Sequence, residues 1–319
     1  MEFRRLRRAD LSTFFPVLRL GLGELEHATG LDQDADTSYA QLSRRSTWAL
    51  LWLLRILGRS PVEIYVAADG PRVVGTGTLL LLPQAGYVVG MSTDPGFRGR
   101  GIASRILALG RAEAVRRHRA WMALDVESEN DTAIRVYRRA GYREVGRSTW
   151  FRRPGVPDPV SLAPEGSGAA SSRELTEVLP HLEAGRPTEY RAALPASPRT
   201  LSHIEIIIRG SRSRQSSWVR RGTTGTVVAV RAHFVPRTRM GVYIPLAGTT
   251  EGGSVEMASA LDAATQWLRP QSPVSCLAVV PEPVGPVGGA LESRGFRAVV
   301  SSTTMVCPVS PSTGSVRPG

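Results

Sequence analysis

Residues Met91–Ser104, with the sequence MSTDPGFRGRGIAS, carry the most informative pattern in the chain. An apolar run ends near Thr93, an Asp-Pro pair turns the chain, and Arg98–Gly101 leads into a helical pattern. Glycines there let the backbone approach a ligand closely, and the N–H groups at a helix N-terminus attract anions. The stretch therefore predicts a strand, a loop and a helix that together bind a pyrophosphate; a plain glycine-rich turn is the alternative.

The segments around this stretch predict a mixed α/β sheet. Two helical patterns precede a strand whose Asp69-Gly70 pair signals a hairpin. Consecutive hairpin strands are then followed by two β-α units. The expected strands are 62–68, 72–82, 87–93, 121–126 and 142–151, and the expected helices are 10–28, 37–57, 101–118 and 131–140.

The second half of the chain repeats this order. A shift of 154 residues carries Gly141-Tyr142 onto Gly295-Phe296, and each pair precedes a strand-like run. We therefore expect a duplicated fold joined by a linker rich in Pro, Gly and Ser. The expected parts are residues 1–152, a linker at 153–172, a second domain at 173–307 and a flexible tail at 308–319.

Composition is that of a globular protein with affinity for anions. The 319 residues fit two domains, 42% of them are hydrophobic, and the net charge is +12 with Arg as the sole strongly basic residue type. Cys276 and Cys307 have no metal-ligand spacing, which predicts free thiols in a reducing compartment and no metal. No secretory signal or membrane-spanning run is convincing, so we expect a cytoplasmic protein without a membrane partner.

Two motifs in the first half resemble those of the GCN5-related N-acetyltransferase (GNAT) family. Arg98-x-x-Gly101-x-Ala103 is similar to its acetyl-CoA signature. Downstream, Leu124–Ala133, Tyr137 and the Gly141-Tyr142 pair follow the family's series of a strand, Asn-x-x-Ala, Tyr and Gly-aromatic. The resemblance covers about residues 1–152 and implies a GNAT-type sheet with acetyl-CoA as cosubstrate.

The resemblance also implies where acetyl-CoA binds. Two parallel strands, which end near Thr93 and Val126, splay apart and take the pantetheine arm between them. Backbone amides of the glycine loop hold the diphosphate, and Asn130 both caps the next helix and contacts the cofactor. The implied cofactor-binding residues are Met91, Ser92, Thr93, Arg98, Gly99, Arg100, Gly101, Ile102, Ala103, Ser104 and Asn130.

Acetyl transfer to an amine requires two proton transfers. An alkyl ammonium has a pKa near 10.4, so a base must deprotonate it, and the departing thiolate benefits from a proton donor. Tyr137 matches the family position of that donor; a half-buried structural tyrosine is the alternative. The resemblance makes Asp125 the first candidate for the base, because ribosomal-protein N-terminal acetyltransferases of the family have an acidic residue at this position. Glu127, which shares the same strand face, is the second. A solvated acidic strand end is the alternative for both carboxylates.

The family builds its acceptor pocket from the first two helices and their loop, here Gly30–Ser38. Its Asp32, Asp34 and Asp36 serve either to attract a cationic amine or to cap the following helix. Trp48–Leu57 is apolar on nearly all sides, which favours a core or domain-interface helix over an aromatic acceptor wall. The acceptor remains open between a small-molecule amine and a protein N-terminus, and the sequence indicates no oligomeric state.

The second half lacks the groups that acetyl transfer needs. The 154-residue shift places Val279, Val284 and Leu291 where Asp125, Asn130 and Tyr137 stand. The loop at 250–255 keeps glycines but has no arginine and adds Glu251, which repels a diphosphate. We therefore expect a degenerate domain that supports the first one.

Two other functions compete with an enzyme. A non-catalytic sensor of acyl-CoA needs the glycine loop but neither Asp125 nor Tyr137. A nucleic-acid-binding protein is indicated by arginine clusters at 4–8, 111–119 and 212–221, but these lack interleaved aromatic residues and any recognised motif.

Overall fold

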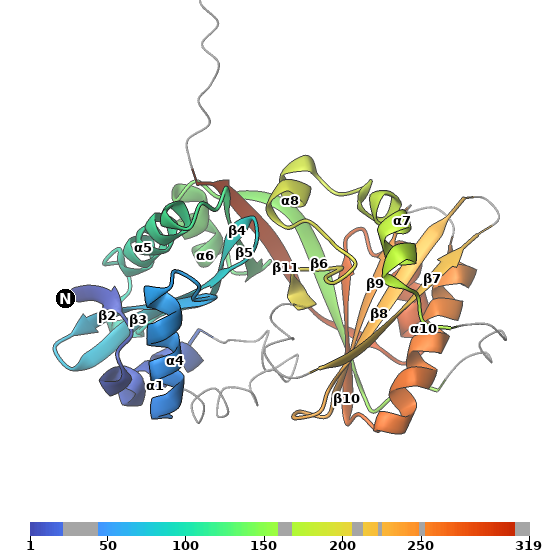
Figure 1. Cartoon of the computed structure of the whole chain (residues 1–319), viewed down its shortest axis with the longest axis horizontal. Helices are drawn as coiled ribbons and strands as arrows, with labels where there is room; N and C mark the ends of the chain where they lie inside the picture. The colour runs from blue at the N-terminus through green and yellow to red at the C-terminus, as the bar shows by residue number, and fades with distance from the viewer. Residues whose placement is uncertain (22–43, 159–167, 206–212, 223–224, 249–252, 310–319) are drawn as a thin grey trace, which may run out of the picture. The chain divides into compact units, whose positions relative to one another are not determined.

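The structure is a computed structural model of the chain, shown in Figure 1. It describes residues 1–21, 44–158, 168–205, 213–222, 225–248 and 253–309. The expected acceptor loop Gly30–Ser38, the central part of the expected linker and the tail beyond residue 309 lie outside the described residues.

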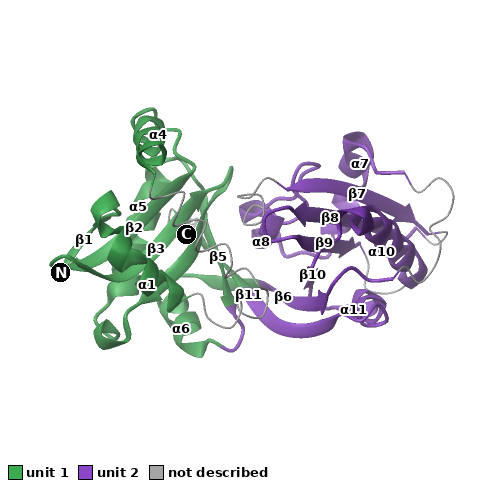
Figure 2. Cartoon of the chain, turned by 90° about the horizontal axis from the view of Figure 1, so that it is seen from below, with its two compact units in different colours: residues 1–126, 130–145, 304–319 green, residues 127–129, 146–303 purple. Residues whose placement is uncertain are grey.

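The chain divides into two compact units, coloured separately in Figure 2. Unit 1 comprises residues 1–126, 130–145 and 304–319, and unit 2 comprises residues 127–129 and 146–303. The elements of the first half are β1 Glu2–Arg5, α1 Leu11–Arg19, α4 Arg45–Ile56, β2 Val62–Asp69, β3 Arg72–Leu81, β4 Ala85–Thr93, α5 Ile102–Arg116, β5 Trp121–Glu127, α6 Asp131–Arg139 and β6 Arg143–Pro154. Those of the second half are α7 Ser172–Glu183, α8 Thr188–Ala193, β7 Arg214–Arg221, β8 Val227–Val235, β9 Met240–Ala247, α10 Ser254–Leu268, β10 Ser275–Pro281, α11 Gly285–Glu292 and β11 Arg297–Pro308.

The sheet of unit 1 runs in the order β1-β2-β3-β4-β5, followed by the C-terminal part of β11. The Asp69-Gly70 pair forms the predicted hairpin, in which Asp69 pairs with Arg72 and Gly70 has a φ of 58°. One face of this sheet packs on α5 and α6 through a core that includes Ile106, Leu124 and Ile134. The other face packs on α1 through residues such as Phe14. Unit 1 is therefore a three-layer α/β unit.

Unit 2 repeats this architecture. Its strands run in the order β7-β8-β9-β10, followed by β6, and α10 and α11 pack on one face of the sheet. The 154-residue shift carries the bounds of β5 onto those of β10 and the bounds of β6 onto those of β11. The predicted mixed α/β fold and its duplication are confirmed.

The two units exchange the ends of β6 and β11. Phe151 of β6 lies in the core of unit 2, whereas Met305 and Cys307 of β11 lie in the core of unit 1. The predicted parts 1–152 and 173–307 differ from the observed units at these strand ends. β6 and β11 have equivalent positions in the repeat, and the core in which the end of each strand lies depends on tertiary packing.

This exchange makes the stability of unit 1 depend on the last strand. Met305 is fully buried, and Met305→Ala is expected to destabilise unit 1 by about 2–5 kcal/mol through lost burial and a residual cavity. Hydrogen exchange should show reduced protection in β2–β4 of unit 1. The matched control is Met257→Ala, which removes an equally buried side chain from the core of unit 2. If both Met305→Ala and Met257→Ala reduced protection only in β8 and β9, the end of β11 would not belong to unit 1.

α4 differs from expectation. We predicted from Trp48–Leu57 a core or domain-interface helix, but none of the α4 residues is buried. Trp48 packs against the core on the α1 face, whereas Trp52 and Ile56 are 63% and 61% exposed. A helix that contacts its unit along one side leaves the rest of an apolar surface exposed, so this is not a core helix.

Candidate active site

β4 and β5 separate at the end where the glycine loop begins. They pair in parallel from Ala85 and Trp121 as far as Val88 and Leu124. Beyond this last pair, β4 continues to Thr93 and β5 to Glu127. The predicted splay of two parallel strands is confirmed.

A β-bulge in β4 lies at this splay. Thr76 pairs with Ser92 while Thr78 pairs with Val89, so β4 has one extra residue between these pairs. Gly90 lies within it at a φ of 60°, and a Cβ there would lie 2.9 Å from the Leu18 side chain. Only glycine combines this backbone conformation with this close packing. The bulge changes the direction of the strand just before Met91–Thr93, the predicted wall for the pantetheine arm.

The glycine loop ends on the N-terminus of α5. Gly99 and Gly101 have φ values of 76° and 74°, and a Cβ added to either would meet no atom within 4 Å. The first α-helical hydrogen bond of α5 runs from the Arg105 N–H to the Gly101 carbonyl. The N–H groups of Ile102–Ser104 therefore precede the helical ladder and remain available to an anion.

Two exposed arginines flank this loop. The Arg98 Nε lies 3.5 Å from the Thr93 carbonyl oxygen, and an Arg100 Nη donates to the Gly96 carbonyl at 3.3 Å. The Arg100 guanidinium also lies 4.8 Å from the centre of the Phe97 ring. Backbone N–H groups, the helix dipole and two cations thus converge on one exposed loop.

Asp125 and Tyr137 lie on opposite faces of the sheet. In β5, Leu124 and Val126 face the core under α5, so Asp125 points to the other face, on which α1 packs. Tyr137 of α6 belongs to the α5-side core and is 8% exposed. Burial raises the pKa of Tyr137 to about 12, so its hydroxyl stays protonated at neutral pH.

The carboxylate of Asp125 accepts two short hydrogen bonds. The Tyr87 hydroxyl donates to Oδ2 at 2.6 Å, and the Thr304 hydroxyl donates to Oδ1 at 2.6 Å. Neither partner was predicted. Tyr87 resembles any strand aromatic, and Thr304 lies in the other half of the sequence, so no sequence signal pointed to this contact.

The other predicted residues lie near these strand ends. Asn130 caps α6, because its side chain accepts a hydrogen bond from the Ala133 N–H at 3.0 Å, as predicted. Glu127 is half-buried at the end of β5. Ser104 is exposed in the first turn of α5.

A family model described as "Acetyltransferase (GNAT) family" matches residues 29–142. The chain carries a GNAT acetyltransferase domain. The match contains the bulge, the glycine loop, Asp125 and Tyr137. GNAT acetyltransferases are acyl-CoA-dependent transferases.

Solved structures extend the similarity to the second half. A tandem GNAT protein from the clavulanic acid biosynthesis pathway is 15% identical over 98% of this chain and 99% of its own, with a TM-score of 0.55. A GCN5-related N-acetyltransferase from Sphaerobacter thermophilus is 13% identical over 97% and 96%, with a TM-score of 0.55. A putative acetyltransferase from Pyrococcus horikoshii is 12% identical over 96% and 89%, with a TM-score of 0.54. These likenesses concern the fold. No curated protein matches the chain.

The unit 2 counterpart of the GNAT site is apolar. Val279 and Leu291, which stand where Asp125 and Tyr137 would be, are 3% and 0% exposed. The β8–β9 register runs without a bulge, and Pro245, which pairs with Val230 as Ser92 pairs with Thr76, occupies the place of Ser92. Proline has no N–H to offer a ligand. Gly253 still precedes α10 at a φ of 83°, while residues 249–252 of that loop lie outside the described part of the chain.

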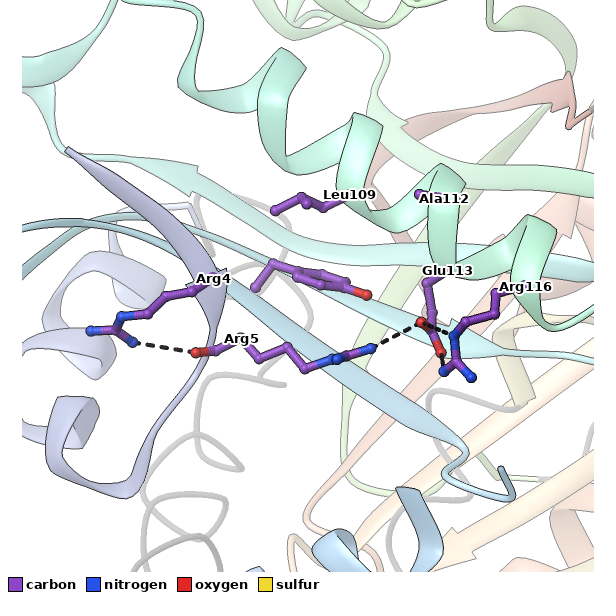
Figure 3. Close-up of a pocket in the computed structure, with 7 residues that line it drawn as sticks. Arg4, Arg5, Leu109, Ala112, Glu113 and Arg116 are labelled. Atoms are coloured by element: carbon purple, nitrogen blue, oxygen red, sulfur yellow. Dashed lines mark hydrogen bonds and ion pairs between the residues drawn. The ribbon is translucent and has the colours of Figure 1, made fainter. Parts of the chain in front are cut away.

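A pocket in unit 1 lies at the end of α5 that is remote from the glycine loop. Figure 3 shows this pocket of about 380 Å³, which lies between β1–β2 and the C-terminal half of α5. The arginines that line the pocket already form ion pairs with carboxylates. Both Arg4 Nη groups donate to Asp10, and Arg5 and Arg116 donate to Glu113.

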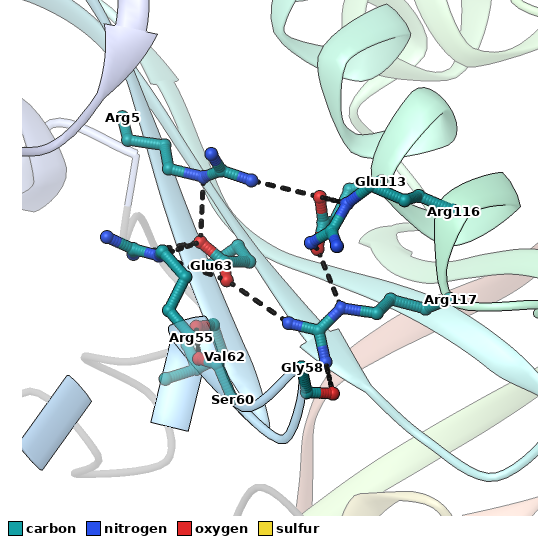
Figure 4. Close-up of polar contacts among 9 residues, drawn as sticks. All are labelled: Arg5, Arg55, Gly58, Ser60, Val62, Glu63, Glu113, Arg116 and Arg117. Carbon is teal, nitrogen blue, oxygen red and sulfur yellow. Dashed lines mark hydrogen bonds and ion pairs between the residues drawn. The ribbon is translucent and has the colours of Figure 1, made fainter. Parts of the chain in front are cut away.

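Two of these arginines, Arg5 and Arg116, belong to a network around two buried carboxylates, shown in Figure 4. Glu63 is paired with Arg5, Arg55 and Arg117, and Glu113 with Arg5, Arg116 and Arg117. Desolvation by burial raises the pKa of Glu113, but the hydrogen bonds from Arg116 and Arg117 outweigh it, and the net pKa is lowered. The network thus ties β1, β2 and α4 to the end of α5, and we assign it to structure.

No helix in the described part of the chain is both long and apolar enough to cross a bilayer.

The glycine loop yields a direct test of acetyl-CoA binding. Gly101→Glu places a carboxylate beside the free N–H groups of α5, and we expect acetyl-CoA affinity to fall at least tenfold, about 1.4 kcal/mol. Calorimetry should also show one site per chain for the wild type. Gly70→Glu is the matched control, because Gly70 has a similar positive φ and open space in the β2–β3 turn. Equal affinity for the two variants would move the site elsewhere.

Proposed function

We propose that this chain is an acetyl-CoA-dependent N-acetyltransferase that acts on a primary amine and works through its GNAT domain alone. The observation that carries the proposal is the splay of β4 and β5. The glycine loop follows β4 beyond the last β4–β5 pair, and Asp125 and Tyr137 lie on opposite faces of the sheet.

The residues at the splay fit acetyl-CoA. The exposed loop combines free N–H groups at Ile102–Ser104 with the charges of Arg98 and Arg100, which suits a diphosphate. The open space at Gly99 and Gly101 leaves room for phosphate oxygens against the backbone. Backbone groups of Met91–Thr93, beyond the last β4–β5 pair, are available to the amide groups of the pantetheine arm. When bound there, acetyl-CoA supplies the activated acetyl group.

The placement of Asp125 and Tyr137 suits a direct transfer. An amine that enters from the α1 face meets Asp125, which accepts the ammonium proton directly or through one water. Attack of the free amine on the acetyl carbonyl forms the amide bond and breaks the thioester, and the amide nitrogen releases its surplus proton to solvent. Tyr137, on the α5 face, donates its hydroxyl proton to the departing thiolate and regains a proton from solvent. Glu127 is the alternative base.

Unit 2 is assigned a supporting role. Its Val279 and Leu291 provide no proton transfer, and its Pro245 provides no N–H at the position of Ser92. Unit 2 nevertheless shares strands with the GNAT domain through the exchanged ends of β6 and β11. Loss of chemistry with retention of fold is the simplest account of this unit.

One observation favours a second candidate, a non-catalytic acyl-CoA-binding protein. Both oxygens of Asp125 already accept a hydrogen bond, which is also what a purely structural carboxylate does. Such a protein retains the glycine loop and needs no proton transfer.

A screen of primary amines that monitors CoA thiol release separates the two functions. The panel should contain polyamines, amino acids, amine-bearing antibiotics and peptides with free N-termini. For an enzyme we expect at least one amine to raise CoA release well above the rate without amine, with the acetylated product identified by mass spectrometry. Tight acetyl-CoA binding with no stimulation by any amine would instead establish the sensor.

A further inference from the structure

Asp125 is held by hydroxyl groups from the strands on both of its sides. In the strand order β4-β5-β11, Tyr87 lies on β4, Asp125 on β5 and Thr304 on β11. Tyr87 and Thr304 are each 2% exposed, and each donates to a different oxygen of the carboxylate at 2.6 Å. The carboxylate is therefore held in one orientation by two bonds from buried donors.

Thr304 is itself held firmly in unit 1. Its neighbour Met305 and, further along, Cys307 point into the α5-side core, so Thr304 points to the opposite face with Asp125. The end of β11 is anchored by two contacts, in which the Val309 N–H donates to the Ala120 carbonyl and Arg111 donates to the Val309 carbonyl. The Thr304 hydroxyl is thus presented by a strand that packing fixes in place.

Two hydrogen bonds do not exhaust this carboxylate. An ionised carboxylate offers about four lone-pair sites, so hydrogen bonds from two hydroxyls do not by themselves prevent proton transfer from an amine to Asp125. Because proton transfer requires heavy atoms within hydrogen-bond reach, a carboxylate that rotates freely is a poorer base than one held in a single orientation.

We propose that Thr304 is a positioning residue for Asp125, so that the last strand of the chain completes the active site of the GNAT domain. The proposal rests on the proposed function, in which Asp125 is the base. It also gives the second half of the chain a specific part in the reaction, because Thr304 belongs to that half by sequence and to unit 1 by structure.

The test compares three variants of the full chain with an acceptor from the amine screen. Thr304→Val keeps the shape but removes the hydroxyl, and we expect kcat to fall about tenfold or more while the KM for acetyl-CoA stays the same. Thr304→Ser restores the hydroxyl and should recover kcat to within about threefold. Thr303→Val is the matched control, because the buried Thr303 hydroxyl bonds to Ser128 Oγ at 2.9 Å and not to Asp125.

Three results would overturn the positioning role: a wild-type kcat for Thr304→Val, a Thr304→Ser variant as slow as Thr304→Val, or an equal loss for Thr303→Val. The last two would indicate strand packing instead of hydrogen bonding.

A second measurement works without any acceptor. The carboxyl carbon of Asp125, assigned by Asp125→Asn, can be titrated by NMR in wild type and Thr304→Val. Loss of a donor to the charged form should raise the pKa of that carboxyl by about one unit. An unchanged titration would refute the positioning proposal even if amines are acetylated. A raised pKa without any turnover would refute the proposed function and leave the contact established.

Discussion

Tyr137→Phe is expected to lower kcat by a factor of roughly 10² to 10⁴ while acetyl-CoA affinity stays similar. The substitution removes one hydroxyl from a side chain that is 8% exposed in the α5-side core, so the fold should be retained. The reason for the loss is that the departing thiolate no longer receives a proton. Because burial raises the pKa of Tyr137 to about 12, wild-type kcat should show no descending limb from this group below that pH.

The matched control is Tyr142→Phe. The Tyr142 ring lies 5.9 Å from that of Tyr137 and is as deeply buried, and its hydroxyl has no hydrogen-bond partner among the described residues. Removing that hydroxyl should leave kcat unchanged, and stability should stay the same or rise. Steady-state kinetics on both variants decide the assignment, and a loss of less than threefold for Tyr137→Phe would transfer the donor role to water or another residue.

Asp125→Asn is expected to reduce activity by a comparable factor at pH 7 and to recover it at high pH. The amide keeps the size of the carboxylate but does not accept the ammonium proton. Above about pH 10 an alkyl amine is largely unprotonated and needs no base. The measurement is kcat/KM as a function of pH for wild type and variant with the same acceptor.

The pH dependence of the activity loss distinguishes a general base from a carboxylate that only holds the strands together. Glu129→Gln serves as control, because Glu129 is an exposed carboxylate two residues beyond the end of β5. A loss for Asp125→Asn that is equal at every pH would mean that Asp125 only links β4 and β11 through Tyr87 and Thr304. Full activity would make Glu127 the next candidate, together with desolvation of the amine.

Much of the fold was predictable because its signals are local. The glycine loop and the apolar periodicity of the following helix predicted α5 from its sequence. The Asn130 cap was predictable for the same reason, since a cap is made within a few residues. The bulge at Gly90 was not predicted, because it is defined by the register between β3 and β4.

The candidate site divides in the same way. Arg98–Ser104, Asp125 and Tyr137 lie on motifs that can be recognised in sequence, whereas the bonds from Tyr87 and Thr304 to Asp125 arise only when β4, β5 and β11 lie side by side. The exposure of α4 was not predictable either, because the sequence of an apolar helix is the same whether or not other elements cover the helix.

The sequence by itself determined the α/β class, the 154-residue repeat and the half that carries the GNAT motifs, since each depends on periodicity or on residues close together in the chain. Only the tertiary structure decided that the end of β6 belongs to unit 2 and the end of β11 to unit 1. The two strands have equivalent positions in the repeat, and which unit the end of each strand joins depends on contacts between residues far apart in the chain. Thr304 reaches Asp125 as a consequence of that exchange.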